Sequence, residues 1–153
     1  MDGQKRESLS AAKALLAKVR TGTLSVIDPE AGGAYGALVN VAVAGQLTPV
    51  ILVSTLSRHT QGLLKNPLAS LMVHGDLPQD GDPLTQLRAT ITGRFQKSDD
   101  GSVRAAYLTH HPYAAMYADF GDFSFWRMQP EKIFIVAGFG RVHSFDFADL
   151  LAA

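Results

Sequence analysis

An arginine and a histidine, Arg58 and His59, lie side by side where a helix is expected to begin. They follow the apolar run VILV (Val50 to Val53), and Ser57 or Thr55 could cap the helix. Free backbone N–H groups and the helix dipole attract anions at such a point, and a guanidinium and an imidazole would strengthen that attraction. A phosphate would fit there. The alternative is that both side chains are solvated residues of an ordinary helix start.

Other groups that could do chemistry are sparse. Cysteine is absent, which excludes disulfides, thiolate metal sites and a cysteine nucleophile. His110 and His111 are adjacent, so on a helix they point about 100° apart and cannot chelate one ion as an i, i+4 pair does. No Walker loop, no G-x-G-x-x-G after a strand and no G-x-S-x-G elbow is present. We therefore expect no metal site, and any redox chemistry requires a cofactor.

Composition indicates a soluble protein of one domain, residues 1–153. The 14 basic and 14 acidic residues cancel, so no global positive field favours nucleic acid or an anionic membrane as a partner. A chain of 153 residues with 46% hydrophobic content is long enough for one core. The N-terminus lacks a secretory signal, and no segment approaches the roughly 20 apolar residues of a membrane span. We expect a cytoplasmic protein.

The elements that must position these residues are mainly short strands. The expected strands cover residues 23–28, 37–45, 48–54, 68–75, 88–97 and, with an interruption at Pro130, 123–136. The stretch 138–145 is expected to continue the sheet. In RATITGRFQK, residues 88–97, apolar and polar side chains alternate, so one face belongs to the core.

Helices are expected between and around the strands. Apolar spacing predicts one over residues 8–22, capped by Ser8 and ended by Gly22. The others are expected from Ser57 to Asn66, over 102–111 with Asp99 or Asp100 as cap, over 112–120, and over 147–153. Strands and helices do not alternate strictly, so a mainly β, antiparallel barrel with peripheral helices fits better than a doubly wound parallel sheet.

A cluster of aromatic residues in the second half of the chain has two interpretations. It could stack on a flat ligand, or it could be part of the core or of a subunit interface. The cluster consists of Tyr113, Tyr117, Phe120, Phe123, Phe125 and Trp126.

Taken in order, the motifs SRH, NP, RATITGR, HP, FSFWRMQPE and GFGR resemble the pyridoxamine 5′-phosphate oxidase-like family of FMN-binding split barrels. The branch that includes bacterial haem-utilisation proteins is the most similar, and the resemblance runs from Leu9 to Phe145. It implies an antiparallel, Greek-key-like split β-barrel, FMN as cofactor, and a homodimer with the flavin at the subunit interface.

The resemblance also assigns the flavin contacts. Around the phosphate it places Ser57, Arg58 and His59, with His59 standing where many relatives have lysine. Along the ring edge it places Ala37, Leu38 and Val39, and near the ribityl chain Val53 and Ser54. The resemblance also implies that Arg88 and Thr90 reach the flavin of the other subunit.

The function implied is that of an FMN-dependent oxidoreductase with an unidentified small substrate. Vitamin B6 oxidases end in R-L-H-x-R, whereas residues 141–145 here keep Arg141 and His143 as candidate substrate residues and lack the second arginine. Pyridoxamine 5′-phosphate oxidation is therefore not expected. Two alternatives stay open: a haem- or tetrapyrrole-binding or haem-degrading protein, in which His143 or His74 ligates iron, and a non-enzymatic flavin carrier or sensor.

Overall fold

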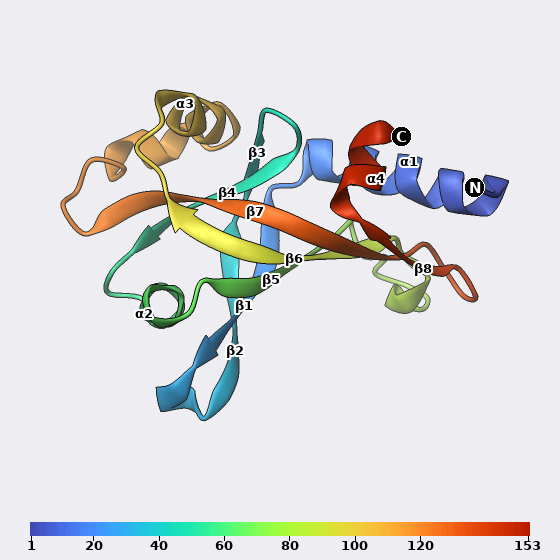
Figure 1. Cartoon of the computed structure of the whole chain (residues 1–153), viewed down its shortest axis with the longest axis horizontal. Coiled ribbons are helices and arrows are strands. Elements are labelled where there is room, and N and C mark those ends of the chain that lie inside the picture. The colour runs from blue at the N-terminus through green and yellow to red at the C-terminus, as the bar shows by residue number, and fades with distance from the viewer.

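A computed structural model describes residues 1–153 as a strongly twisted sheet of eight antiparallel strands with helices at its margins (Figure 1). The strands are β1 (Thr21–Asp28), β2 (Gly33–Asn40), β3 (Ala42–Ala44), β4 (Thr48–Ser54), β5 (Leu68–His74), β6 (Arg88–Lys97), β7 (Phe123–Val136) and β8 (Val142–Asp146). The helices are α1 (Gly3–Lys18), α2 (Arg58–Lys65), α3 (Gly101–His110) and α4 (Phe147–Ala152). Short 3-10 turns are η1 (Pro29–Ala31), η2 (Pro83–Thr85) and η3 (Pro112–Met116). The expected class, mainly antiparallel β with peripheral helices, is confirmed.

The strand order is β2-β1-β5-β6-β7-β4-β3, with β8 paired to β7 beside this path. On one side β7 pairs with β6, and on the other side its first half pairs with β4 and its second half with β8. The expected interruption at Pro130 is wrong, because β7 runs through it. Pro130 lies opposite Gly93 at a register shift, and any Cβ on Gly93 would collide with the Gln129 carbonyl.

The main core is built from residues of the sheet together with apolar residues of α1. Alternation in β6 is as expected, with Ala89, Ile91, Gly93 and Phe95 buried. The main apolar cluster has 23 buried residues and includes the inner face of α1. A second cluster of 7 buried residues holds α3 and η3 against β3, β4 and β7. The α3–η3 region therefore packs on its own small core.

Two expected helix boundaries were wrong. Helix α1 begins at Gly3, where the Asp2 carboxylate accepts from the Lys5 N–H at 2.8 Å, and Ser8 is buried inside the helix. It ends at Lys18, and Gly22 belongs to β1. By contrast, Asp100 caps α3 as expected, accepting from the Ser102 N–H at 2.9 Å.

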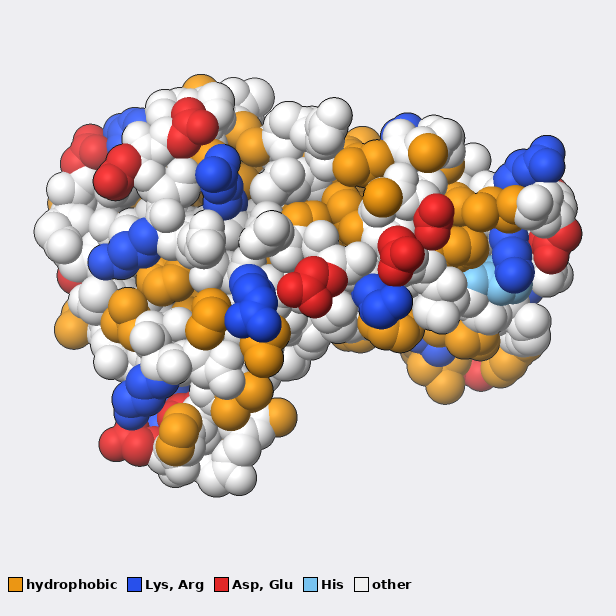
Figure 2. All heavy atoms as spheres, viewed as in Figure 1, with side chains coloured by type: hydrophobic (Ala, Val, Ile, Leu, Met, Phe, Trp, Pro, Cys, Tyr) orange, Lys and Arg blue, Asp and Glu red, His pale blue; other side chains and the backbone are white.

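The outline of the molecule is uneven. Figure 1 shows the β1–β2 hairpin projecting from the sheet, with α1 and α4 grouped near the β8 end. On the face shown in Figure 2, acidic and basic side chains are interspersed among hydrophobic ones. None of the helices has the length and apolar character that a membrane span requires.

Candidate functional site

A hollow of about 310 Å³ lies where β2, β4, the start of α2 and the α3–η3 region meet. It is lined by 11 residues, 7 of them hydrophobic. They are Leu38, Val39, Asn40, Leu52, Val53, Ser54, Ser57, His59, Tyr107, Tyr117 and Phe123. The lining includes no lysine, arginine, aspartate or glutamate. Its composition suits an apolar ligand with an aromatic ring system, oriented by a few polar groups.

The corner between β4 and α2 forms because two serines turn the chain. Ser54 Oγ donates to Asp122 Oδ2 at 2.6 Å and accepts from the Leu56 N–H at 3.1 Å. Ser57, the N-cap of α2, donates its hydroxyl hydrogen to the Ser54 carbonyl at 2.7 Å. Helix α2 then packs tightly on β1, since a Cβ on Gly62 would lie 2.7 Å from Val26 Cγ2. These contacts place Ser54, Ser57 and the first turn of α2 at the hollow.

His59 supplies a neutral imidazole to this lining. Its Nε2 lies 3.3 Å from Ser57 Oγ, which also lies 2.6 Å from the Thr60 hydroxyl oxygen. A neutral ring carries hydrogen on one nitrogen and keeps a lone pair on the other. Burial lowers the pKa of His59, so the ring is uncharged at neutral pH. An imidazole in this state can ligate a metal or accept a proton.

Three aromatic rings form the opposite wall. Tyr107 comes from α3, Tyr117 from the end of η3 and Phe123 from the start of β7. The rings of Tyr117 and Phe123 lie 5.0 Å apart, and Tyr107 packs edge-on against Phe125 at 5.6 Å. Burial raises the pKa of Tyr107 and Tyr117, so both hydroxyls stay protonated.

Sequence reasoning anticipated part of this wall. Tyr117 and Phe123 belonged to the aromatic cluster that could stack on a flat ligand, but Tyr107 was missed. The available signal was its position one helical turn from Val103 and His111, on the apolar face of α3.

Arg58 does not face the hollow. Its Nη1 lies 3.2 Å from Asp28 Oδ2 and 3.2 Å from Glu30 Oε2, so its charge is paired with carboxylates at the end of β1 and in η1. Asp28 is only 2% exposed. Burial alone would raise the pKa of this carboxyl, but the Arg58 guanidinium and the Glu30 N–H outweigh it and hold the pKa below 3.8. Arg58 and His59 therefore do not converge on one anion.

The structure brings together Leu38, Val39, Val53, Ser54, Ser57 and His59 from the expected cofactor contacts. Ala37 pairs with Leu24 and lies outside the lining. Arg88 donates to the Leu84 carbonyl at 2.9 Å and to the Gln86 carbonyl at 3.3 Å, beside η2. That Arg88 and Thr90 reach the site of a second subunit stays a prediction.

The expected substrate residues lie elsewhere. Arg141 pairs with Glu7 of α1 at 2.9 Å, and His143 is on β8, which joins the end of β7 opposite to β4 (Figure 1). Nε2 of His143 is buried without a hydrogen-bond partner. His74, at the end of β5, is exposed and bonds through Nδ1 to the Gly75 carbonyl at 2.6 Å. The hollow includes none of these three residues.

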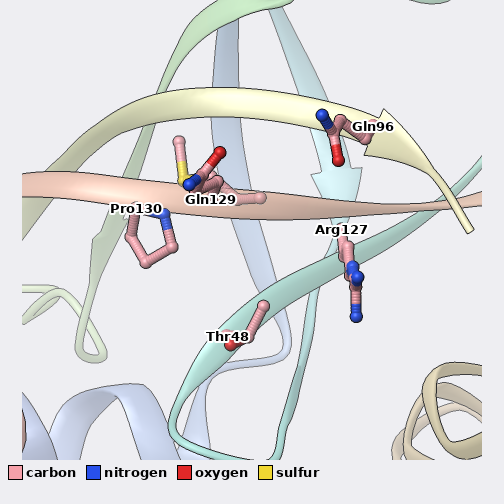
Figure 3. Close-up of a pocket in the computed structure, with 6 residues that line it drawn as sticks. Thr48, Gln96, Arg127, Gln129 and Pro130 are labelled. Atoms are coloured by element: carbon pink, nitrogen blue, oxygen red, sulfur yellow. The ribbon is translucent and has the colours of Figure 1, made fainter.

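Another hollow, of about 340 Å³, lies on β4, β6 and β7. Figure 3 shows its labelled side chains: Thr48 from β4, Gln96 from β6, and Arg127, Gln129 and Pro130 from β7. Its lining is polar and has neither an aromatic ring nor an imidazole. It is the weaker candidate for a flat ligand.

The fold is that of a split barrel, and the chain belongs to the CREG β-barrel family, whose model matches residues 4–150. A putative pyridoxamine 5′-phosphate oxidase from Listeria innocua has the same fold, with a TM-score of 0.66 at 16% identity, covering 85% of this chain and 98% of that one. The expected split-barrel class is confirmed.

Two more similar proteins are named for haem. The chloroplastic haem oxygenase HOZ of Arabidopsis thaliana is 41% identical over 106 residues, which are 67% of this chain and 32% of that protein. A haem binding protein from Mycobacterium smegmatis has a TM-score of 0.86 at 28% identity, covering 95% of this chain and 60% of that one. The chain thus spans about a third of the plant protein and three fifths of the bacterial one.

The expectation of FMN as cofactor is wrong. The two similar proteins are a haem oxygenase and a haem binding protein. The geometry agrees, because the guanidinium expected to hold the flavin phosphate is paired with two carboxylates outside the hollow. The oxidoreductase and carrier interpretations that relied on a flavin lose their cofactor, and the hollow has to be interpreted for another ligand.

The buried Asp28–Arg58 pair predicts a pH dependence of stability. A carboxyl whose folded pKa is depressed stabilises the fold above its ordinary pKa and loses that contribution as pH falls through the folded value. We expect Asp28→Asn to lower the melting temperature at pH 7 and to flatten the loss of stability below pH 3.8. Thermal unfolding followed by circular dichroism between pH 2.5 and 7 measures both effects. Glu30→Gln, at the exposed end of the same cluster, is the control with little effect at pH 7. Parallel curves for Asp28→Asn and wild type would contradict this account.

Proposed function

We propose that this chain is a haem-binding split-barrel protein and that haem binds in the hollow beside His59. The observation that carries the proposal is a neutral imidazole placed in an aromatic pocket, in a chain whose similar proteins are named for haem. The proposal adopts the haem-binding alternative that the sequence left open, with His59 in place of His143 or His74 as the iron ligand.

The residues present fit such a ligand. Haem presents a flat apolar macrocycle and an iron that proteins bind through His, Met, Cys or Tyr. Tyr107, Tyr117 and Phe123 offer ring surface, Leu38 and Leu52 offer apolar surface, and His59 offers the nitrogen. The lining has no cationic side chain to pair with the haem carboxylates. This favours an orientation in which the carboxylates remain in contact with water.

Size indicates that one protomer holds only part of the ligand. The hollow of about 310 Å³ is at the lower end of the range for ligand pockets, roughly 300–1,000 Å³. Around it, Leu38 is 79% exposed and Leu56, between Ser54 and Ser57, is 87% exposed. Met116 and Phe120, on either side of Tyr117, are exposed as well. We propose that a second copy of the chain covers these side chains and completes the site as a homodimer.

A second candidate function is oxidative breakdown of the bound haem. The 41% identity to a plant haem oxygenase favours it, although the chain covers only 32% of that protein. The iron, when bound, supplies redox chemistry with dioxygen, and an external reductant has to supply electrons. For their part, the protonated hydroxyls of Tyr107 and Tyr117 can donate hydrogen bonds into the pocket, and the apolar lining excludes water.

Hemin titration tests the binding proposal. Removal of a residue that only supports a metal ligand costs about 10–100-fold in affinity, so His59→Ala should weaken hemin by at least about tenfold and shift the Soret band. Absorption spectra of the purified protein at pH 7.5 measure both. His74→Ala, exposed and outside the hollow, is the matched control and should bind as wild type. If His143→Ala or His74→Ala changes the spectrum and His59→Ala does not, the assignment of the pocket is wrong.

Sedimentation equilibrium at micromolar concentration tests the dimer. We expect wild type to be dimeric and Leu56→Glu to be monomeric, because a buried carboxylate without a partner opposes association. Leu84→Glu alters an exposed leucine in η2 and should remain dimeric. A wild-type protein that is monomeric with and without hemin would refute the shared site.

Aerobic turnover separates binding from catalysis. With ascorbate as reductant and catalase to remove free peroxide, an oxygenase should lose its Soret band in air and keep it under nitrogen. A Soret band that is equally stable in both atmospheres would leave haem binding as the function.

A further inference from the structure

The hollow of about 340 Å³ on β4, β6 and β7 lies where one strand leaves the sheet, and we call it the polar hollow. The ladder between β4 and β7 ends at the pair Val50–Arg127, and Thr48 pairs instead with Ala44 of β3. On the same side of β7, the ladder with β8 begins only at Lys132. The polar hollow therefore lies beside a stretch of β7 that has no neighbouring strand on that side.

Four polar side chains share the face of the sheet on which the polar hollow opens (Figure 3). Gln96 of β6 and Val50 of β4 lie directly opposite Arg127 of β7, and residues opposite one another point to the same face. Gln129 is two residues from Arg127 and Thr48 is two residues from Val50, so both belong to this face as well. Val50 is part of the second apolar cluster, which packs α3 on the sheet. The four polar side chains therefore lie just beyond the area that α3 covers.

The side chains of Thr48, Gln96, Arg127 and Gln129 have no hydrogen-bond or ion-pair partner within the protein. Four other arginines are held in ion pairs, whereas the guanidinium of Arg127 keeps its five N–H donors for another partner. The lining contains no carboxylate. The polar hollow thus offers one planar cation together with two carboxamides and a hydroxyl.

The charged groups nearest to the polar hollow are occupied elsewhere. Asp100, the N-cap of α3, accepts from the backbone and the hydroxyl of Ser102, each at 2.9 Å. These bonds are the main cause that lowers the pKa of Asp100, and the charge of Arg127 adds to their effect. Arg94 lies opposite Gln129 and is paired with Glu131 at 3.6 Å. Arg127 therefore remains the cation that a ligand in the polar hollow would meet.

We propose that the polar hollow binds a small monocarboxylate that carries hydroxyl groups. A planar guanidinium matches the two oxygens of a carboxylate, and one cation balances one negative charge, whereas a phosphate group carries nearly two at neutral pH. The carboxamides of Gln96 and Gln129 and the hydroxyl of Thr48 both donate and accept, which suits the hydroxyl groups of the ligand. This hollow shares no lining residue with the one beside His59, so the proposal does not rest on haem binding.

NMR titration with D-gluconate, a hydroxylated monocarboxylate, tests the proposal. The side-chain N–H signals of Arg127, Gln96 and Gln129 report directly on the polar hollow. At neutral pH and constant ionic strength, we expect these signals to shift and to saturate with a Kd of about 1 mM. Sorbitol, the matching polyol without a carboxylate, should cause no shift. Acetate lacks the hydroxyl groups and should bind about tenfold more weakly.

Substitutions distinguish the planar guanidinium from charge alone. Arg127→Gln should weaken gluconate at least about tenfold, because a hydrogen bond to a charged group is lost. Arg127→Lys keeps the charge without the planar fork and should restore only part of the affinity. Arg94→Gln alters a cation on the same face that is already paired with Glu131, and it should bind as wild type. Both arginines are exposed, so an unchanged spectrum away from the polar hollow is expected to show that each variant is folded.

Several results would overturn the proposal. Sorbitol that binds as tightly as gluconate, or an Arg127→Gln protein that binds as wild type, would show that no carboxylate is recognised at this position. Inorganic phosphate that binds more tightly than gluconate would indicate a site for charge alone. Shifts that grow in proportion to gluconate without saturating would show that the four side chains are an ordinary solvated surface.

Discussion

Strand β7 is hydrogen-bonded along one side to β6 and along the other side to two different strands, and the rest of the molecule is arranged around this pairing. The β4 ladder ends at Arg127, and the β8 ladder begins at Lys132. Pro130 falls between them, where β7 has no neighbour on that side, and it faces Gly93 on the other side. A proline in the middle of a sheet is tolerated here because its missing N–H falls in this gap. One end of β7 consequently supports the pocket, and the other end supports the terminal helices.

The sequence predicted the elements whose signals are local. The bounds of β6 agree with expectation because its alternating side chains reflect burial on one face. The start of α1 was placed too late, since its first turns are exposed and only the Asp2 cap marks them. The continuity of β7 was missed because the preference of Pro130 is local, whereas Gly93, which accommodates it, is far away in sequence. Pairing between distant residues is what a single sequence does not display.

The same distinction applies to the candidate site. The corner from Ser54 to His59 was found because a strand end, a capping serine and a helix start follow one another directly. Arg58 was misplaced because its partner Asp28 lies 30 residues away, and no local pattern shows that its charge is already neutralised. The choice of FMN followed from the fold, and one fold can host several cofactors, so the resemblance predicted the fold correctly and the ligand wrongly.

The ion pairing of Arg58 has a consequence for how quickly the pocket can fill. Arg58 lies outside the lining in ion pairs with Asp28 and Glu30, so the lining carries no formal charge at neutral pH, and the chain as a whole has equal numbers of acidic and basic residues. Long-range steering accelerates association when a site presents charge of one sign, and it fades as ionic strength rises. A site without such charge captures its ligand only after random encounter, so its association rate is nearly independent of salt. It gains no advantage over other acceptors by attracting an acidic ligand from a distance. For the proposed ligand, differences in affinity between variants are then expected mainly in the dissociation rate.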